Sequence, residues 1–177
     1  GNMTNGWVEN TVIENNYILQ GGNGGQNFND WSNAGNGGCG IYSLRLPDDG
    51  NWSADNHALI IRGNNLIVGG NGGMDNAIMF GTGGNGGHAI WVGDNNNAGS
   101  LLISGNRMIA GGNGGGTGSP SGICGSGGSG MYLNDCDSGV RIDIRDHPDI
   151  VGGNGGMGPF GWGTGSDDEV FTREDLI

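Results

Sequence analysis

The sequence predicts an all-β fold, a right-handed parallel β-helix (β-solenoid) of about four glycine-rich coils. The first observation is a motif, GGNGG, that begins at Gly21, Gly69, Gly111 and Gly152, so that successive copies are almost evenly spaced. The second is that apolar residues recur at fixed distances before each motif. The third is that two of these apolar positions are spaced by two, which is the period of a β-strand and not of a helix. Self-similarity at such a period is typical of stacked repeat proteins.

Four columns emerge when the copies are aligned on GGNGG. Eight residues before the motif lie Ile13, Ile61, Ile103 and Ile144. Ten residues before it lie Thr11, Leu59, Leu101 and Ile142, and two residues before it lie Leu19, Ile67, Ile109 and Ile150. Five residues before it lie Asn16, Asn64, Asn106 and His147. The apolar columns predict strands. The Asn column, flanked by Gly63 or Gly105, predicts the bend between them, because asparagine tolerates the left-handed conformation.

A further strand is expected after each glycine segment, where Ile41, Ile90 and Met131 form another column. One copy alone cannot bury its Ile and Leu side chains, whereas stacked copies join them into a continuous apolar core. We therefore expect the Ile column eight residues before the motif to be in contact from copy to copy. The winding should be right-handed, because parallel crossovers nearly always are.

The glycine segments are expected to be ordered, although glycine-rich tracts are usually flexible linkers. The segments from Gly21 to Ile41, from Gly69 to Ile90 and from Gly111 to Met131 are almost equal in length, a constancy that a linker does not need. Because glycine lacks a Cβ, extended or polyproline-II-like chains can pack backbone against backbone. The first copy also carries a seven-residue insertion within residues 46–56, which a surface loop tolerates.

The pattern I-x-x-N-x-x-I, as in Ile61 to Ile67 and Ile103 to Ile109, resembles right-handed parallel β-helix proteins of the pectate-lyase-like superfold. The glycine-rich insert segments look similar to those of phage and secreted adhesins. That superfold includes polysaccharide lyases and hydrolases, phage tailspikes and passenger domains of secreted adhesins. The resemblance therefore implies an extracellular or cell-surface location. One copy, such as Gly69 to Gly111, is longer than a usual coil, so either the glycine segment leaves the coil or each copy is two short coils.

Charge and hydropathy exclude several classes of partner. The chain has 18 acidic and 6 basic side chains and a net charge of −12. Such a surface repels nucleic-acid phosphates and lacks the basic patch that docks on anionic lipid. No apolar run approaches the length of about 18 residues that a membrane span needs. We expect no nucleic-acid partner and no membrane insertion.

Aromatic residues in the predicted loops indicate a sugar-binding surface, because aromatic rings stack on sugar rings and neighbouring Asn and Asp side chains hydrogen-bond the sugar hydroxyl groups. The glycine segments carry Phe28, Trp31, Phe80, Phe160 and Trp162, and the insertion carries Trp52. The alternative is that these rings fold back over the glycine layer. The predicted ligand-binding residues are Trp52, Asp48, Asp49, Asp55, Asp94 and Trp31. The expected partner is a glycan or a cell-surface polysaccharide.

Acidic residues gather in the last copy, where Asp135, Asp137, Asp143 and Asp146 form a candidate calcium site, since oxygen-rich clusters suit Ca²⁺. A solvated acidic end is the alternative, and no other cofactor is expected. No catalytic residue is assigned, because strand alternation splits the charged groups of residues 143–147 between two faces. The preferred function is a non-catalytic secreted or surface module that binds glycans or serves as an adhesin or structural segment. The alternative is a fragment of a polysaccharide lyase or hydrolase.

The ends and the outer face of the repeat complete the prediction. Residues 1–165 are assigned to the repeats, and residues 166–177 to an acidic C-terminal cap that shields the last coil. Nine residues before GGNGG lie Val12, Ile60, Leu102 and Asp143, which alternation points away from the core. An apolar ladder rarely stays exposed, so we expect this outward column to pack under the glycine segments or to mediate self-association.

Overall fold

The computed structural model describes residues 11–44, 46, 59–93, 99–134, 141–146, 149–159 and 161–162, and these residues form an all-β structure. The first parallel sheet has the order β1 (Thr11–Glu14), β4 (Leu59–Arg62), β7 (Ser100–Ser104), β10 (Arg141–Arg145). The second has the order β2 (Leu19–Gln20), β5 (Leu66–Val68), β8 (Met108–Ala110), β11 (Asp149–Val151). The third has the order β3 (Ile41–Ser43), β6 (Ile90–Val92), β9 (Met131–Leu133). A short antiparallel pair, β12 (Met157–Gly158) and β13 (Gly161–Trp162), follows.

The register between copies confirms the columns predicted from the repeat. In the first sheet, Ile13, Ile61, Ile103 and Ile144 are successive partners. In the second sheet the partners are Leu19, Ile67, Ile109 and Ile150, and in the third they are Ile41, Ile90 and Met131. Among the described residues, each of the four copies therefore adds one strand to the first and second sheets, and each of the first three copies adds one to the third. Every pairing within these three sheets is parallel.

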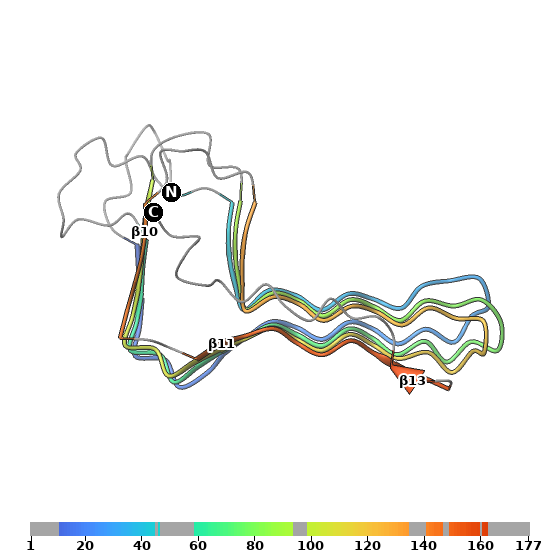
Figure 1. Cartoon of the computed structure of the whole chain (residues 1–177). Helices are drawn as coiled ribbons and strands as arrows, with labels where there is room; N and C mark the ends of the chain where they lie inside the picture. Colours follow the sequence, from blue (N-terminus) through green and yellow to red (C-terminus); the bar gives the residue numbers. More distant parts are fainter. Residues whose placement is uncertain are drawn as a thin grey trace.

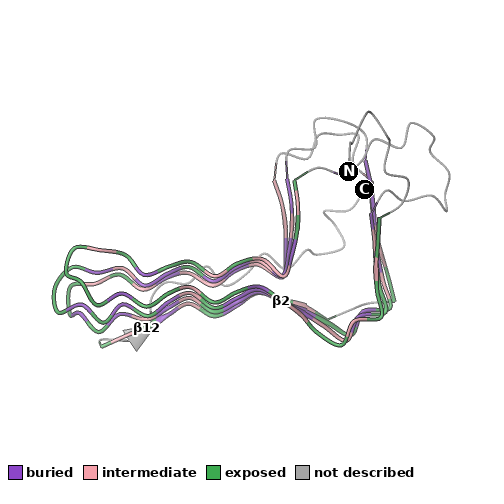
Figure 2. Cartoon of the chain, turned by 180° about the vertical axis from the view of Figure 1, so that it is seen from behind, coloured by how far each residue is buried: buried purple, intermediate pink, exposed green. Residues whose placement is uncertain are grey.

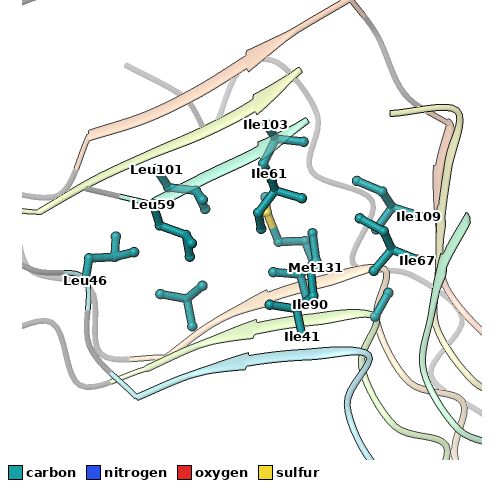
Figure 3. Close-up of a cluster of buried hydrophobic side chains, with 12 residues drawn as sticks. Ile41, Leu46, Leu59, Ile61, Ile67, Ile90, Leu101, Ile103, Ile109 and Met131 are labelled. Carbon is teal, nitrogen blue, oxygen red and sulfur yellow. The ribbon is translucent and has the colours of Figure 1, made fainter. Parts of the chain in front are cut away.

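The core lies between the three sheets, where these columns point toward one another (Figure 3). Ile61 and Ile103 come from the first sheet, Ile67 and Ile109 from the second, and all four are fully buried. Ile90 and Met131 from the third sheet complete the cluster. The side chains at the two ends of the column, Ile13 and Ile144, are only partly buried. The apolar ladder is thus closed only in the middle copies, as stacking of repeats requires.

A left-handed residue forms the corner between the first and second sheets in all four copies. These residues are Asn15 (φ 56°), Gly63 (φ 62°), Gly105 (φ 58°) and Asp146 (φ 59°). Glycine, asparagine and aspartate adopt this conformation at low cost. The corner lies one residue before the predicted Asn position, so the Asn column has a different task.

The Asn column forms a hydrogen-bonded ladder in which Asn64 and Asn106 are buried and Asn16 is half-buried. Asn64 Oδ1 accepts from the backbone N–H of Asn16 (3.0 Å) and from its amide Nδ2 (2.9 Å). Asn64 Nδ2 donates to Ile13 O (3.1 Å) and to Asn106 Oδ1 (2.9 Å). Each amide therefore satisfies backbone groups that the corner leaves without strand partners. His147, the fourth member predicted for this column, lies outside the described residues.

Replacing Asn64 with alanine should destabilise the fold strongly, because it leaves several buried donors and acceptors without partners. Each orphaned buried group costs about 1–3 kcal/mol, so the melting temperature should fall by at least about 5 °C. The matched control is Asn71→Ala, which removes an exposed asparagine amide whose Oδ1 accepts from Asn113 N. Thermal unfolding followed by circular dichroism tests both variants. Equal melting temperatures for the two would show that the buried ladder contributes no more than a surface amide.

The glycine segments leave the three sheets and form a separate arm, so the excursion and not the two-coil alternative is correct. Figure 1, in which equivalent segments of successive copies overlie one another, shows the arm as two layers that project away from the sheets. The outgoing segments are residues 21–27, 69–75, 111–117 and 152–157. The returning segments are residues 33–40, 82–89 and 123–130.

Backbone hydrogen bonds join the arm in two directions. Along one layer, Gly24 N donates to Asn71 O of the next copy (2.8 Å). Between the layers, Gly38 N donates to Gly22 O of its own copy (2.7 Å), and Gly70 N donates to Gly38 O of the preceding copy (2.8 Å). The bonds repeat every third residue, which is the period of a polyproline-II helix. The expectation of ordered glycine segments that pack backbone against backbone is confirmed.

Most glycines of the arm that lie between neighbouring segments have no room for a side chain. A Cβ built on Gly24 would overlap Gly35 O, and one built on Gly70 would overlap Gly22 O. The third residue of each triplet points out, and there Asn23 Oδ1 accepts from Asn71 N of the next copy (2.9 Å). Figure 2 shows the resulting alternation of buried and exposed residues along both layers. The GGN triplet therefore matches the packing of this arm, with glycine at the two positions between segments and asparagine at the outward position.

Candidate binding surface at the tip of the glycine arm

Large apolar side chains are exposed where the outgoing segments turn into the returning ones. We call residues 28–32, 76–81 and 118–122, together with the adjoining Ile123, the tip. Six exposed side chains belong to it, namely Phe28, Trp31, Ile78, Met79, Phe80 and Ile123. The arm holds the tip away from the sheets (Figure 1). Phe28, Trp31 and Phe80 are exposed, so these three rings do not fold back over the glycine layer, whereas the side chains of Trp52, Phe160 and Trp162 lie outside the described part.

Trp31 and Phe80 form a stacked aromatic pair at the tip. Their ring centroids are 4.6 Å apart and their planes differ by 22°. Trp31 is 72% exposed, so ring surface remains accessible beyond the face that Phe80 contacts. Both residues have a positive φ, 65° for Trp31 and 48° for Phe80, which is an outlier for bulky side chains. Such backbone strain costs about 1–3 kcal/mol per residue and clusters at functional sites.

Asp75 is a fully buried carboxylate at the base of the tip. Its Oδ1 accepts from Asn27 Nδ2 (2.8 Å) and from Ala77 N (3.2 Å), and its Oδ2 accepts from the Thr117 hydroxyl (3.0 Å). Asn27, Asp75 and Thr117 are also backbone bridge partners. One carboxylate therefore connects the bases of all three tip turns.

Each turn is also shaped by the residue in that column. Asn27 Oδ1 accepts from Asn29 N (3.0 Å), and the Thr117 hydroxyl accepts from Ser119 N (3.1 Å). These are side-chain turns in which a polar side chain bonds the backbone two residues later. Asp30 Oδ1 accepts from Ile78 N (3.0 Å) and thus connects the first turn to the second. The tip is positioned by hydrogen bonds, whereas its apolar side chains face outward.

A second aromatic group lies on the outer face of the third sheet. Tyr42 and Trp91 stack at 4.5 Å with an interplanar angle of 6°, and Tyr132 stacks on His88 at 4.6 Å. The Trp91 ring also lies over Gly93, where an added Cβ would overlap it. Tyr42 is 61% exposed and Trp31 is 72% exposed, so both groups leave ring surface accessible. The tip differs in the positive φ of both stacked residues and in the exposed aliphatic side chains that surround them.

Of the predicted ligand-binding residues, the described part of the chain includes Trp31, which lies at the tip. Trp52, Asp48, Asp49, Asp55 and Asp94 lie outside the described residues, so the predicted ridge around the insertion stays a prediction. Leu46, at the start of that insertion, is buried in the core cluster beside Gly99. The tip residues Ile78, Met79 and Ile123 were not singled out by sequence reasoning, because isolated aliphatic residues among glycines carry no periodic signal.

Of the candidate calcium ligands, Asp143 and Asp146 are described and Asp135 and Asp137 are not. Asp143 Oδ2 accepts from Arg145 (Nε at 2.9 Å) and lies 3.7 Å from the Arg141 guanidinium. Asp146 occupies the left-handed corner after β10. Among the described residues no group of three or more His, Cys, Asp and Glu side chains is placed to hold a metal ion. The calcium site therefore depends on residues outside this part.

The outward apolar column lies on the first sheet as predicted, with Val12, Ile60, Leu102 and Asp143 in register. The prediction that this column packs under the glycine segments is wrong, because the arm projects away from the first sheet (Figure 1). Val12 is exposed, and Ile60 and Leu102 are half-buried. Self-association through this column stays a prediction.

No protein-family model, curated protein or solved structure matches this chain. Among the described residues there is no helix long and apolar enough to cross a membrane. Cys39 and Cys124 are free thiols, and burial raises the pKa of Cys39, which disfavours the reactive thiolate. The assignment of a function therefore depends on the geometry of this chain alone.

Proposed function

We propose that this chain is a non-catalytic, secreted or surface-displayed binding module that presents a glycan-binding tip at the end of a rigid glycine arm. The observation that carries the proposal is the exposed Trp31–Phe80 stack, in which both residues hold a strained, positive φ. An exposed indole supplies the apolar platform for the face of a sugar ring. The exposed side chains of Asn29 and Asp30 beside it supply partners for sugar hydroxyl groups.

The arm supports this proposal because it fixes the tip without a hydrophobic core of its own. Bonds within a layer, such as Gly24 N to Asn71 O, and bonds between the layers, such as Gly38 N to Gly22 O, recur from copy to copy, so the tip turns are held in one register. A preorganised site loses less conformational entropy when it binds a ligand.

Two further parts of the proposal concern the type of fold and go beyond the observation of three parallel sheets. We propose that the coils wind as a right-handed parallel β-helix of the pectate-lyase-like type, and that the glycine arm is equivalent to the inserts of phage and secreted adhesins.

The proposal is tested with a glycan array, run with and without Ca²⁺, followed by calorimetric titration of the best ligand. Trp31→Ala should weaken binding about tenfold or more, because it removes the stacking platform. The matched control is Tyr42→Ala, which removes a stacked ring that is also well exposed (61%) but lies on the third sheet. The control should bind as the unchanged protein does, and both variants should keep their circular dichroism spectra.

Other outcomes distinguish the alternatives. Binding that survives Trp31→Ala but is lost in Trp52→Ala would place the site on the predicted ridge of the insertion. Release of reducing sugar from polysaccharides by the purified chain would favour the lyase or hydrolase alternative. The absence of any ligand on the array, together with unchanged cell-surface binding by Trp31→Ala, would remove the tip from consideration.

A further inference from the structure

The glycine arm has an open edge at its first copy. A Cβ built on Gly22 or Gly25 meets no atom within 4 Å. The equivalent residues of the second copy, Gly70 and Gly73, face the carbonyl oxygens of Gly22 and Gly25 in contact too close for any side chain. The same backbone contact recurs in the third and fourth copies. Within the described part of the chain, the first copy therefore lacks the neighbour that every later copy has.

Hydrogen-bond donors are left over at this edge. Gly70 N donates to Gly38 O (2.8 Å) and Gly73 N to Gly35 O (2.8 Å) of the preceding returning segment. The equivalent amides of the third and fourth copies, Gly112, Gly115, Gly153 and Gly156, donate in the same way. Among the described residues, the amides of Gly22 and Gly25 have no acceptor. Exposed backbone edges of this kind are templates for pairing with another chain.

We call the position beside this edge the seat, and it accepts only a particular kind of extended segment. In each later copy the seat is filled by a returning segment, and the residue facing the following outgoing segment is Gly37, Gly86 or Gly127. A Cβ on any of these would overlap the next outgoing carbonyl, for example Gly70 O for Gly37. The occupant must therefore carry glycine opposite Gly22. Opposite Gly25 it could carry a small side chain, since Ala34 and Cys124 occupy the equivalent positions, one triplet nearer the tip, in the first and third copies. The occupant must also extend with three residues per turn, so that its carbonyls meet amides three residues apart.

We propose that the open edge formed by Gly22 and Gly25 docks a polyproline-II segment of another polypeptide that carries two glycines in every three residues. Its carbonyls accept from the Gly22 and Gly25 amides, as Gly38 and Gly35 accept in the next copy. This continues an interface that the arm already contains three times. The inference is independent of the glycan-binding tip, because it concerns the backbone of the arm and not the exposed rings.

A second copy of this chain, stacked head to tail, does not fit the seat. The last described returning segment, residues 123–130, is already covered on its following side by residues 152–156. There Gly153 N donates to Gly128 O (2.7 Å) and Gly156 N donates to Gly125 O (2.8 Å). The first outgoing segment of another copy would need that same position. The occupant must be a glycine segment whose following side is free.

The test is a titration of the isotope-labelled chain with the blocked peptide GGNGGNGGNGG, followed by amide NMR and hydrogen exchange. We expect saturable shifts and slower exchange at Gly22 and Gly25, with Gly70 and Gly112 unchanged. The control peptide GANGANGANGA, which differs by one methyl group per triplet, should not bind. The double variant Gly22→Ala, Gly25→Ala should stay folded, because the added Cβ atoms meet nothing, and should lose at least tenfold in affinity.

Three results would overturn the proposal. The first is the absence of saturable shifts at about 10 mM peptide, a concentration that detects even very weak binding. The second is an equal response to the alanine-containing peptide. The third is protection of the Gly22 and Gly25 amides in the free chain, combined with self-association that the double variant abolishes, which would make a second copy the occupant.

Discussion

Replacing Gly70 with alanine is expected to disrupt the glycine arm, whereas the same replacement at Gly22 is expected to be neutral. The two glycines are equivalent in the repeat and differ only in what they face. A Cβ on Gly70 would overlap the carbonyl of Gly22, whereas a Cβ on Gly22 would meet no atom within 4 Å. Because the opposing atom is backbone, it cannot move aside as the end of a flexible side chain can.

The expected cost of Gly70→Ala is at least that of overpacking a core, about 1–3 kcal/mol. The melting temperature should fall by about 2–4 °C for each kcal/mol lost in a chain of this size. Amide hydrogen exchange should accelerate at Gly38 and Gly87, which lie in the two returning segments on either side of residues 69–75. Equal stability of Gly70→Ala and Gly22→Ala would contradict a backbone-packed arm.

Replacing Asp75 with alanine is expected to disorder the tip. The change removes the acceptor of three bonds, from Asn27 Nδ2, Ala77 N and the Thr117 hydroxyl. Since each orphaned buried group costs about 1–3 kcal/mol, the loss should be about 3 kcal/mol or more. Asp75→Asn should be tolerated much better, because an amide oxygen still accepts at Oδ1 and an amide N–H can donate to the Thr117 oxygen.

The control for the loss of one negative charge is Asp149→Ala, which removes an exposed aspartate at the start of β11. Thermal unfolding follows the fold, and the indole N–H resonance of Trp31 in NMR spectra, assigned by its loss in Trp31→Phe, follows the tip separately. We expect Asp75→Ala to alter both, Asp75→Asn to alter neither by much, and Asp149→Ala to leave both unchanged. If Asp75→Ala and Asp149→Ala behave alike, the buried carboxylate does not organise the tip.

Much of the fold could be predicted because alignment of the repeated copies reveals which positions are structurally equivalent. Ile13, Ile61, Ile103 and Ile144 occupy one column in the sequence, and the sheets place them as partners. The same alignment contained the column that organises the tip, since Asn27, Asp75 and Thr117 each lie six residues after the start of GGNGG. That column was missed because its three residue types differ, although all three are short polar side chains that can shape a turn.

The candidate site was predictable only in part. Trp31 was predicted, but its partner Phe80 was not assigned to it, because the two rings fall in adjacent columns and not in the same one when the copies are aligned on GGNGG. The tip turns differ in length, so side chains that stack in space are not aligned in sequence. The exposure of both rings follows from the direction of the arm, which no local pattern contains.

The sequence by itself determined the strand columns and the requirement for glycine in the segments between them, because alternation and the absence of a Cβ are local properties of a chain. Only the tertiary structure decided that these segments leave the sheets as an arm, that Asp75 is buried while Trp31 is exposed, and that Gly22 and Gly70 are inequivalent. The physical reason is that each of these outcomes depends on which copy lies next to a residue. Neighbours in the stack are separated by a whole repeat along the chain, as Gly22 is from Gly70, so no local stretch of sequence contains both.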